Sequence, residues 1–456
     1  MDTVLRNGTV VTATDTYRAD LGIEGSRIAM IGQELQGDRV LDVDGKYIFP
    51  GGVDPHTHLE LDFMDTVSSD DFYTGTVAAA CGGTTTIIDY AEQTEGGTLR
   101  QAVNSWRAKA DPKVVIDYGL HVSITDARED ILTEMEDMVT AGVSSFKCYL
   151  AYPERLRDDE LLRVFIKARE TGALVNVHCE NGWLVDWTTS QLLSEGNTGP
   201  RWHPRSRPAA YEEEATQRAV TLASIAQAPM YVVHLTCLGA LNAARRARDA
   251  GQQVLVETCP QYLLLDVGSY DEPGFGGAKY VLSPPLRESE NLDVLWRGIA
   301  AGDVDSIGTD HCPFNLAGQK DRGRNDFTKI PNGMPGVETR LPLLYHEGVN
   351  SGRITLNRFV ELVATNPARS FGLFPQKGTI AVGSDADLVV WDPDREMPLT
   401  LDNLHMNVDY SPYEQKTVRG YPELVLSRGK VIVRDNQFVG QRGDGRFLER
   451  SPFSLG

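Results

Sequence analysis

Residues 53–58, VDPHTH, combine a short apolar run with two histidines two positions apart. Side chains two positions apart on an extended chain point to the same side, so His56 and His58 can reach one metal ion together. A single His-x-His pair is weak support for a metal site, because such pairs also occur in proteins that bind no metal. Its meaning depends on which residue types end the other β-like runs of the chain.

Seven further β-like runs follow, each apolar and rich in β-branched residues. Amphipathic stretches separate them, for example residues 159–169, which end shortly before Gly172, and residues 212–226. Apolar strands that alternate with helices are typical of an α/β protein with a (β/α)8 TIM barrel, in which both faces of each strand are covered. A doubly wound sheet is the main alternative. The eight runs are VDPHTH, TTTIIDY, VVIDYGLHVSI, SSFKCYL, LVNVHCE, MYVVHLT, VLVETCP and SIGTDH.

Both ends of the chain are β-rich and lack helical periodicity. Residues 2–49 contain short β-like runs separated by Gly, Asn and Asp. Similar β-rich runs occur again in residues 378–392 and 422–439. The two ends therefore predict one small β-sandwich domain, formed by residues 1–50 and 369–456. The barrel domain would comprise residues 51–368.

Composition and charge exclude several classes of protein. No stretch reaches the roughly 18 apolar residues of a membrane span, and a net charge of -20 disfavours nucleic acid and anionic lipid as partners. The start, MDTVLRNGTVVTATD, has no secretory-signal pattern, so we expect a cytoplasmic protein. The six cysteines are far apart without a Cys-x-x-Cys pair, which predicts buried, reduced thiols.

Four further runs end in a residue that can bind a metal or is unexpected in a buried strand. These residues are His178 in VNVHCEN, His234 in YVVHLT, Asp310 in IGTDHCPF and Lys147 in SSFKCYLAY. Because active sites of such barrels lie at the carboxyl ends of the strands, these side chains should converge with His56 and His58 at one mouth. His121 lies within its run and is predicted to be structural. No ligand role is assigned to His203, His311, His346 and His405, although His311 adjoins Asp310 and could support it.

The chain resembles the cyclic amidohydrolases of the amidohydrolase superfamily, and within them the D-hydantoinase and dihydropyrimidinase group. The resemblance extends over nearly the whole chain. It is carried by VDPHTH, SSFKCYLAY, VHCENG, LSEGNTGPRWH, VVHLTC, SPPLRE, GTDHCPF, PNGMPGVE and GTIAVGSDADLVVWDP.

The resemblance implies two divalent metal ions, usually Zn²⁺ with Mn²⁺ and Co²⁺ as alternatives, bridged by a lysine carboxylated on its side-chain nitrogen. The matching residue is Lys147. An ammonium group beside two dications would be repelled, whereas a carbamate is an anion with two oxygens that can bind both metals. By the same resemblance, His56, His58, Lys147 and Asp310 would bind one metal, and Lys147, His178 and His234 the other.

The resemblance also implies hydrolytic ring opening of hydantoins and dihydropyrimidines to N-carbamoyl amino acids. A hydroxide between the metals would attack the ring carbonyl, Tyr152 would stabilise the oxyanion, and Asp310 would pass a proton to the leaving nitrogen. Ser283 and Asn332 would hold the imide-like edge of the substrate. Leu61, Phe63 and Tyr149 would shape the pocket for its exocyclic substituent. The family is usually homotetrameric, with a homodimer as the alternative.

Two departures from the group concern substrate preference and enantioselectivity. The segment LELDFMD replaces a stretch with proline and glycines, and Pro153 follows Tyr152 where relatives carry a basic residue. Alternative functions are an allantoinase or a dihydroorotase; the latter would need a cationic side chain near the pocket, and the sequence does not assign one. A non-catalytic scaffold related to dihydropyrimidinase would have lost metal ligands, and a deaminase or phosphoesterase would normally lack the bridging lysine.

Overall fold

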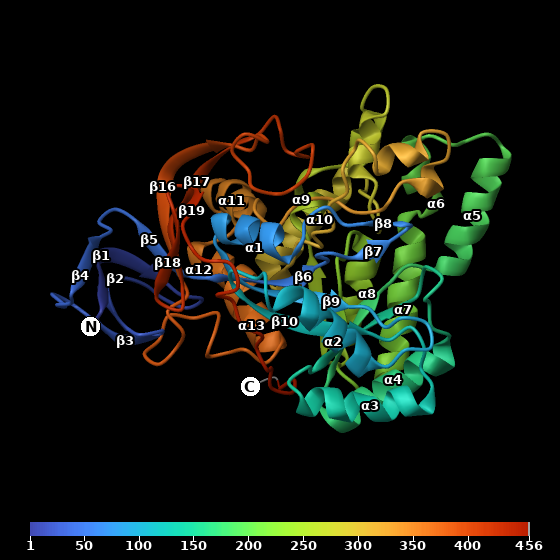
Figure 1. Cartoon of the computed structure of the whole chain (residues 1–456). Helices are drawn as coiled ribbons and strands as arrows, with labels where there is room; N and C mark the ends of the chain where they lie inside the picture. Colours follow the sequence, from blue (N-terminus) through green and yellow to red (C-terminus); the bar gives the residue numbers. More distant parts are fainter. Residues whose placement is uncertain (455–456) are drawn as a thin grey trace.

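The computed structural model describes residues 1–454, and eight parallel strands form its central sheet (Figure 1). The strands follow one another in the sheet in chain order, which confirms the predicted (β/α)8 architecture over a doubly wound sheet. Nearly every residue in these strands is buried, as expected when helices cover a parallel sheet. The strands are β6 (Gly52–Thr57), β9 (Thr84–Ala91), β10 (Asp117–Ser123), β11 (Ser145–Tyr149), β12 (Leu174–His178), β13 (Met230–Val232), β14 (Val254–Thr258) and β15 (Ser306–Ile307).

The first and last barrel strands are joined mainly by side chains and by single backbone contacts. The Thr309 hydroxyl donates to Asp54 (2.7 Å), and the His58 backbone N–H donates to the His311 carbonyl (2.9 Å). The buried Arg340 guanidinium donates to the carbonyls of Val53 and Ile307, each at 2.9 Å. These contacts hold the segment after β15 beside the segment after β6, which brings Asp310 close to His56 and His58.

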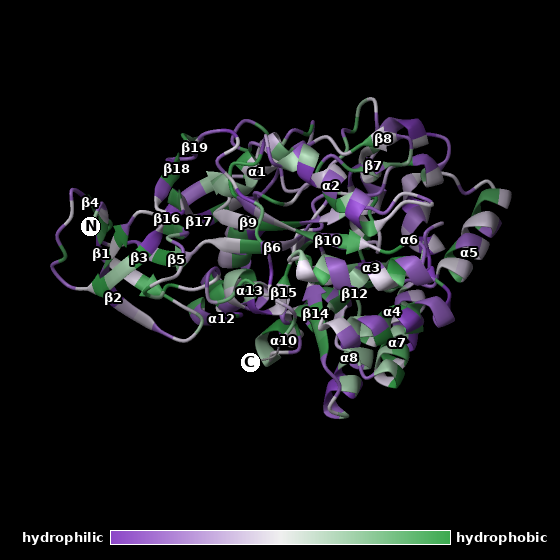
Figure 2. Ribbon diagram, turned by 60° about the horizontal axis from the view of Figure 1, so that its bottom comes forward, coloured by the Kyte–Doolittle hydropathy of each residue, from purple (hydrophilic) through white to green (hydrophobic). Residues whose placement is uncertain are grey.

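Several helices outside the sheet, among them α2, α3, α4 and α8, have one buried face and one solvent face, and Figure 2 shows hydrophobic and hydrophilic residues alternating along the helices. In α4 the buried face carries Leu161, Phe165 and Ala168, and the helix ends at Gly172, which has the left-handed φ of 71°. This agrees with the predicted helix and its predicted end. The larger helices are α1 (Phe72–Cys81), α2 (Leu99–Ala110), α3 (Glu129–Thr140), α4 (Asp158–Thr171), α5 (Gly182–Ser194), α7 (Ala209–Ala226), α8 (Leu238–Asp249) and α10 (Ser289–Ala301).

Short helices occupy several loops and the segment after the barrel. They are α6 (His203–Ser206), α9 (Pro260–Leu264), α11 (Arg340–Leu344), α12 (Leu356–Val360) and α13 (Asn366–Ser370). A small hairpin, β7 (Asp62–Phe63) and β8 (Thr66–Val67), follows β6. No helix within residues 1–454 combines the length and apolar character of a membrane span.

The two chain ends form a second sheet of nine strands beside the barrel (Figure 1). Strand β5 joins the ends because it pairs with β1 and also, antiparallel, with β16. The predicted β-rich unit from both termini is confirmed, and its strands form one continuous hydrogen-bonded sheet. They are β1 (Thr3–Val11), β2 (Thr16–Glu24), β3 (Arg27–Gly32), β4 (Arg39–Asp42), β5 (Tyr47–Pro50), β16 (Leu388–Pro398), β17 (Thr417–Ser427), β18 (Lys430–Arg434) and β19 (Gln437–Phe438).

The segment after β19 returns to the barrel. The Leu448 N–H donates to the Tyr118 carbonyl, and the Phe453 N–H donates to the Gly172 carbonyl, each at 2.8 Å. Arg450 is buried, and its guanidinium donates to the Leu120 carbonyl. The last described residues therefore pack on the barrel rather than on the nine-stranded sheet. The domain boundaries proposed from sequence stay a prediction.

All six cysteines are buried free thiols, which confirms the expectation from their spacing.

Candidate metal centre and active-site cavity

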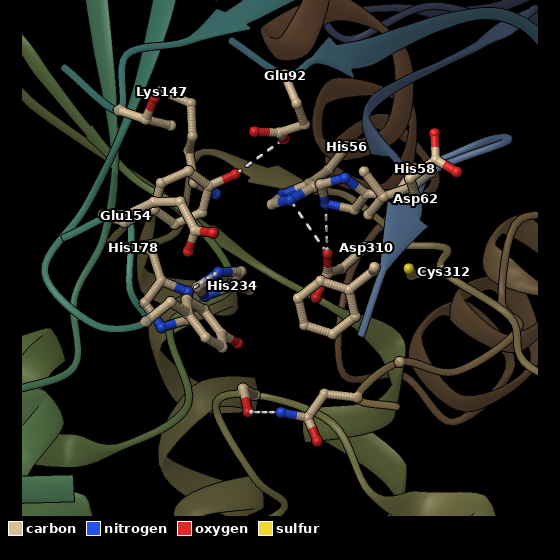
Figure 3. A pocket seen from close by; sticks show the side chains of 18 of the residues that line it. His56, His58, Asp62, Glu92, Lys147, Glu154, His178, His234, Asp310 and Cys312 are labelled. Atoms are coloured by element: carbon tan, nitrogen blue, oxygen red, sulfur yellow. Dashed lines mark hydrogen bonds and ion pairs between the residues drawn. The ribbon is translucent and has the colours of Figure 1, made fainter. Parts of the chain in front are cut away.

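One cavity at the carboxyl ends of the barrel strands brings together all twelve site residues predicted from sequence (Figure 3). Its volume is about 190 Å³. Lys147 lies in β11, His178 is the last residue of β12, and His234 and Asp310 follow β13 and β15. His56 and His58 come from the end of β6. The predicted residues in its lining are His56, His58, Leu61, Phe63, Lys147, Tyr149, Tyr152, His178, His234, Ser283, Asp310 and Asn332.

Asp310 lies between the two histidines of VDPHTH. Its Oδ1 atom is 3.1 Å from His56 Nε2 and 3.2 Å from His58 Nε2, so these three residues form a group that could hold a metal ion. Burial opposes ionisation of Asp310, but the neighbouring His56 and His58 hold its pKa well below the ordinary value. The carboxylate is therefore an anion at neutral pH, as a metal ligand must be.

His56 lies between two carboxylates. Its Nδ1 atom is 2.7 Å from Glu257 Oε1, on the side opposite Asp310. Burial alone would lower the pKa of His56, but Glu257 and Asp310 together raise it to about 9. His58 has only Asp310 beside it, and burial lowers its pKa to about 4. This edge of the cavity thus favours a positive charge, which either a proton on His56 or a metal cation can supply.

His178 and His234 form the other side of the group. His178 Nδ1 and His234 Nε2 lie 3.0 Å apart. Burial lowers the pKa of His178 and takes that of His234 well below its ordinary value, so both imidazoles are neutral at pH 7. Neutral imidazole is the form that binds a metal. The buried Nδ1 atom of His234 has no hydrogen-bond partner within residues 1–454, although such atoms normally have one.

Lys147 is buried without a neutralising partner. It is 1% exposed, and its Nζ atom lies 4.8 Å from the centre of the Tyr90 ring and 5.3 Å from that of Tyr149. No carboxylate in residues 1–454 forms a salt bridge with it, and burial lowers its pKa. A lowered pKa increases the fraction of neutral amine, which is the form that can react with carbon dioxide.

These residues fit divalent cations. They supply four imidazoles, an ionised carboxylate and a lysine whose carbamate would add two oxygens. The buried His56 Nε2 atom, which faces Asp310, has no hydrogen-bond partner within residues 1–454. Nitrogen and oxygen ligands of this kind suit zinc and similar divalent ions.

The substrate-contact candidates lie together in the cavity wall. Asn332 Nδ2 donates to Ser283 Oγ at 3.0 Å, and Arg207 Nη1 donates to the same oxygen at 2.8 Å. Arg207 also forms a 2.7 Å ion pair with Glu180. The Tyr152 ring centre is 5.0 Å from that of His178, and burial raises the pKa of the Tyr152 phenol above its ordinary value.

The residues expected to shape the pocket also line it. Leu61 is buried, Phe63 packs edge-on against Tyr152 with ring centres 6.1 Å apart, and the Tyr149 hydroxyl donates to Glu92 Oε1 at 3.0 Å. Phe63 belongs to the hairpin β7–β8, so the LELDFMD segment forms part of the cavity wall.

Sequence reasoning missed several acidic residues. Glu92, Asp62 and Glu154 line the cavity, and Glu257 and Glu180 contact His56 and His178. Glu92 follows β9 directly, so it carries the same signal, a polar residue after an apolar run, that identified the other candidates. Glu257 is the only acid in the buried strand β14.

The histidines without a predicted ligand role lie outside the cavity lining. His121 is buried, with Nδ1 2.6 Å from Ser145 Oγ and Nε2 3.0 Å from the Pro55 carbonyl oxygen. His311 Nε2 is 3.0 Å from Asp70, and the Gly336 N–H donates to its Nδ1. His311 therefore anchors the segment that carries Asp310.

Comparison with known proteins agrees with this geometry. The chain is 48% identical to a D-hydantoinase of Geobacillus stearothermophilus, covering 99% of this chain and 97% of that protein. It is also 48% identical to a D-hydantoinase of Ralstonia pickettii, covering 99% and 100%. The crystal structure of a dihydropyrimidinase from Brevibacillus agri NCHU1002 matches with a TM-score of 0.99 and 50% identity over 100% of both chains. A model of the Amidohydrolase family matches residues 47–198 and 219–432, and the chain belongs to that family.

Proposed function

We propose that the chain is a metal-dependent cyclic amidohydrolase that opens 5-substituted hydantoins and dihydropyrimidines to N-carbamoyl amino acids. The observation that carries this proposal is the position of Lys147. This buried lysine forms no salt bridge within residues 1–454 and shares its cavity with four histidines and Asp310. The relatives named D-hydantoinase support the D hand for hydantoin substrates.

The proposed metal ligands are the six predicted residues. His56, His58, Lys147 and Asp310 would hold one divalent cation, and Lys147, His178 and His234 the other, with Lys147 carboxylated on Nζ. Zn²⁺ is the proposed metal, with Mn²⁺ and Co²⁺ as alternatives. When bound, such a pair supplies hydroxide at neutral pH, because it can lower the pKa of water to about 7, and it polarises the carbonyl under attack.

Asp310 is the proposed proton carrier. Its depressed pKa makes it a carboxylate in the resting site, and it can accept the proton of the attacking water. As the ring C–N bond breaks, the same proton passes to the leaving nitrogen. This transfer is needed because an amide anion is a poor leaving group.

Tyr152 is the proposed donor to the oxyanion that develops on the attacked carbonyl. Burial raises the pKa of its phenol, so the hydroxyl keeps its proton at neutral pH and can donate a hydrogen bond. Ser283 and Asn332, which already contact each other, are proposed to hold the imide-like edge of the ring. Main-chain and side-chain groups that contact this common edge leave the exocyclic group free to vary.

The acidic residues that line the cavity favour an uncharged cyclic amide as substrate over dihydroorotate, which carries a carboxylate. Asp62, Glu92 and Glu154 line the cavity with Asp310, and Arg207 is engaged by Glu180. A carboxylate on the substrate would therefore meet like charges. Allantoin is neutral and stays an alternative substrate, whereas a non-catalytic scaffold is disfavoured because all six ligand residues line one cavity.

We also propose a cytoplasmic enzyme that assembles as a homotetramer, with a homodimer as the alternative. The resemblance to the family supports this assembly, and mass measurement in solution tests it.

One hydrolysis panel tests the function. The metal-loaded protein is assayed with dihydrouracil, both hands of a 5-substituted hydantoin, allantoin and dihydroorotate. We expect ring opening of the hydantoin and dihydrouracil. Exclusive activity on allantoin or dihydroorotate would contradict the proposal, and so would the absence of all ring opening.

A further inference from the structure

Three carboxylates line the catalytic cavity beyond the proposed metal ligands. Asp62 lies in β7, Glu92 follows β9, and Glu154 lies in the loop after β11. Figure 3 shows Glu92 and Glu154 on the Lys147 side of the cavity and Asp62 beside His58. None of the three has a role in the proposed reaction, so their charges are available to act on another part of the substrate.

Nearby basic side chains do not neutralise this acidic wall. Arg207 pairs with Glu180, and Arg155 pairs with Asp186 (2.8 Å) and stacks over Trp183 (3.9 Å). Asp62 has Lys109 at 3.6 Å. Glu92 shares the cavity with the Lys147 ammonium, whose positive charge the proposed carboxylation would remove. Within residues 1–454, neither Glu92 nor Glu154 forms a salt bridge. Two of the three carboxyl groups of the wall therefore lack an ion-pair partner among the described residues.

Two residues of the acidic wall, Asp62 and Glu154, also line a neighbouring hollow, whose lining includes Arg207 as well. This second hollow, of about 450 Å³, adjoins the catalytic cavity and shares Asp62, Phe63, Tyr152, Glu154 and Asn332 with it. A ring held by Ser283 and Asn332 near the metal ligands would extend its exocyclic substituent along this shared wall. The carboxylates of the acidic wall would therefore face the exocyclic substituent of the bound substrate.

Glu92 is held in place for this role. The Tyr149 hydroxyl donates to Glu92 Oε1 at 3.0 Å, and Ser123 Oγ lies 3.3 Å from the same hydroxyl. Burial raises the pKa of Glu92, which means that the surrounding protein groups stabilise its carboxylate less well than water does. A cation brought by the substrate would supply that compensation.

We infer that the wall formed by Asp62, Glu92 and Glu154 selects cyclic amides whose exocyclic substituent carries a positive charge, such as an amine or a guanidinium. This inference rests on the proposed function. The charge is carried on an alkyl arm, because Phe63 and Tyr149 flank the path and offer apolar contact to its methylenes.

The test compares three hydantoins of similar length on the metal-loaded enzyme, with aminobutyl, pentyl and carboxypropyl substituents. We expect kcat/KM to be at least about tenfold higher for the aminobutyl compound than for the carboxypropyl compound, since like charges in a binding site are costly. The difference should lie mainly in KM and should shrink at high salt, because salt screens charges near the surface.

Charge-neutralising variants locate the effect. Glu92→Gln and Glu154→Gln should each reduce the ratio of kcat/KM for the aminobutyl over the pentyl compound by about threefold or more, within the range of a charge-assisted contact. Glu95→Gln removes an equal charge from an exposed residue outside the cavity lining and should leave that ratio unchanged.

Outcomes of this test separate the two proposals. Hydrolysis of the pentyl compound without a preference for the cation, or equal effects of Glu92→Gln and Glu95→Gln, would overturn the inference and leave the proposed function standing. If none of the three rings is opened and dihydrouracil also persists, the proposed function fails and this inference fails with it.

Discussion

Glu257 orients two of the proposed metal ligands at once. Its Oε1 atom lies 2.7 Å from His56 Nδ1 and accepts the backbone N–H of His234 at 3.1 Å, while its Oε2 atom accepts the Tyr231 hydroxyl. The imidazole of His56 is thereby fixed with Nε2 toward Asp310. A carboxylate behind a histidine ligand commonly sets both its tautomer and its orientation.

Glu257→Gln should weaken metal binding by about 10- to 100-fold, which is typical for loss of a residue that supports a ligand. Titration of the metal-free protein with Zn²⁺ measures this directly. Glu290→Gln, at an exposed position, is the matched control. Equal Zn²⁺ affinity in the two variants would show that Glu257 does not orient the site.

Lys147→Ala should lose both bound metal and ring-opening activity, because the proposed carbamate is the group shared by the two cations. Metal analysis of the purified variant and a hydantoin assay are the measurements. Added short carboxylic acids should restore part of the activity by replacing the carbamate. Lys430→Ala removes an exposed lysine and should retain the parent metal content. A fully active Lys147→Ala protein without added acid is the result that counts against the mechanism.

Tyr152→Phe should lower kcat by about 10² to 10³, the usual effect of removing one donor to an oxyanion. Metal content should stay at the parent level, because Tyr152 is not a proposed ligand. Single-turnover rates on a hydantoin separate this loss from slow product release. A raised KM with an unchanged kcat would instead assign Tyr152 to ground-state binding.

Lys320 should make stability depend on pH. Its Nζ atom donates to the carbonyls of Val281 and Pro331, which lie close to Ser283 and Asn332, and burial lowers its pKa from 10.5 to about 7. Between about pH 7 and pH 10 the unfolded chain binds a proton that the folded chain does not. The free energy of unfolding should therefore rise with pH across this range, by at most about 1.4 kcal/mol per pH unit.

Urea titrations at pH 7.5 and 9.5 compare the parent with Lys320→Met. The variant should lose this pH-dependent gain, whereas Lys329→Met, at an exposed position, should keep it. An identical pH response in all three proteins would mean that Lys320 stays protonated when the chain is folded.

Much of the barrel and the six proposed metal ligands could be inferred from local sequence, whereas the six substrate-contact and pocket residues were predicted only from the family resemblance. A His, Lys or Asp that ends an apolar run is visible without a structure, and barrel topology places such residues at one edge. Glu92 carries the same signal directly after β9 and was overlooked, because an acid after a strand is also common in ordinary loops. Glu257 was not found, because a single acid inside a buried strand has no periodic pattern.

The amino-acid sequence by itself determined the alternation of strands and helices, the β-rich character of both ends and the residue types that could bind metal. These features depend on neighbouring residues and on the apolar pattern along the chain. Only the tertiary structure decided that Glu257 lies behind His56, that Arg207 connects Glu180 to Ser283, and that Asp62, Glu92 and Glu154 share one wall. Those contacts join residues far apart in the chain, and their distances depend on side-chain directions that barrel closure sets.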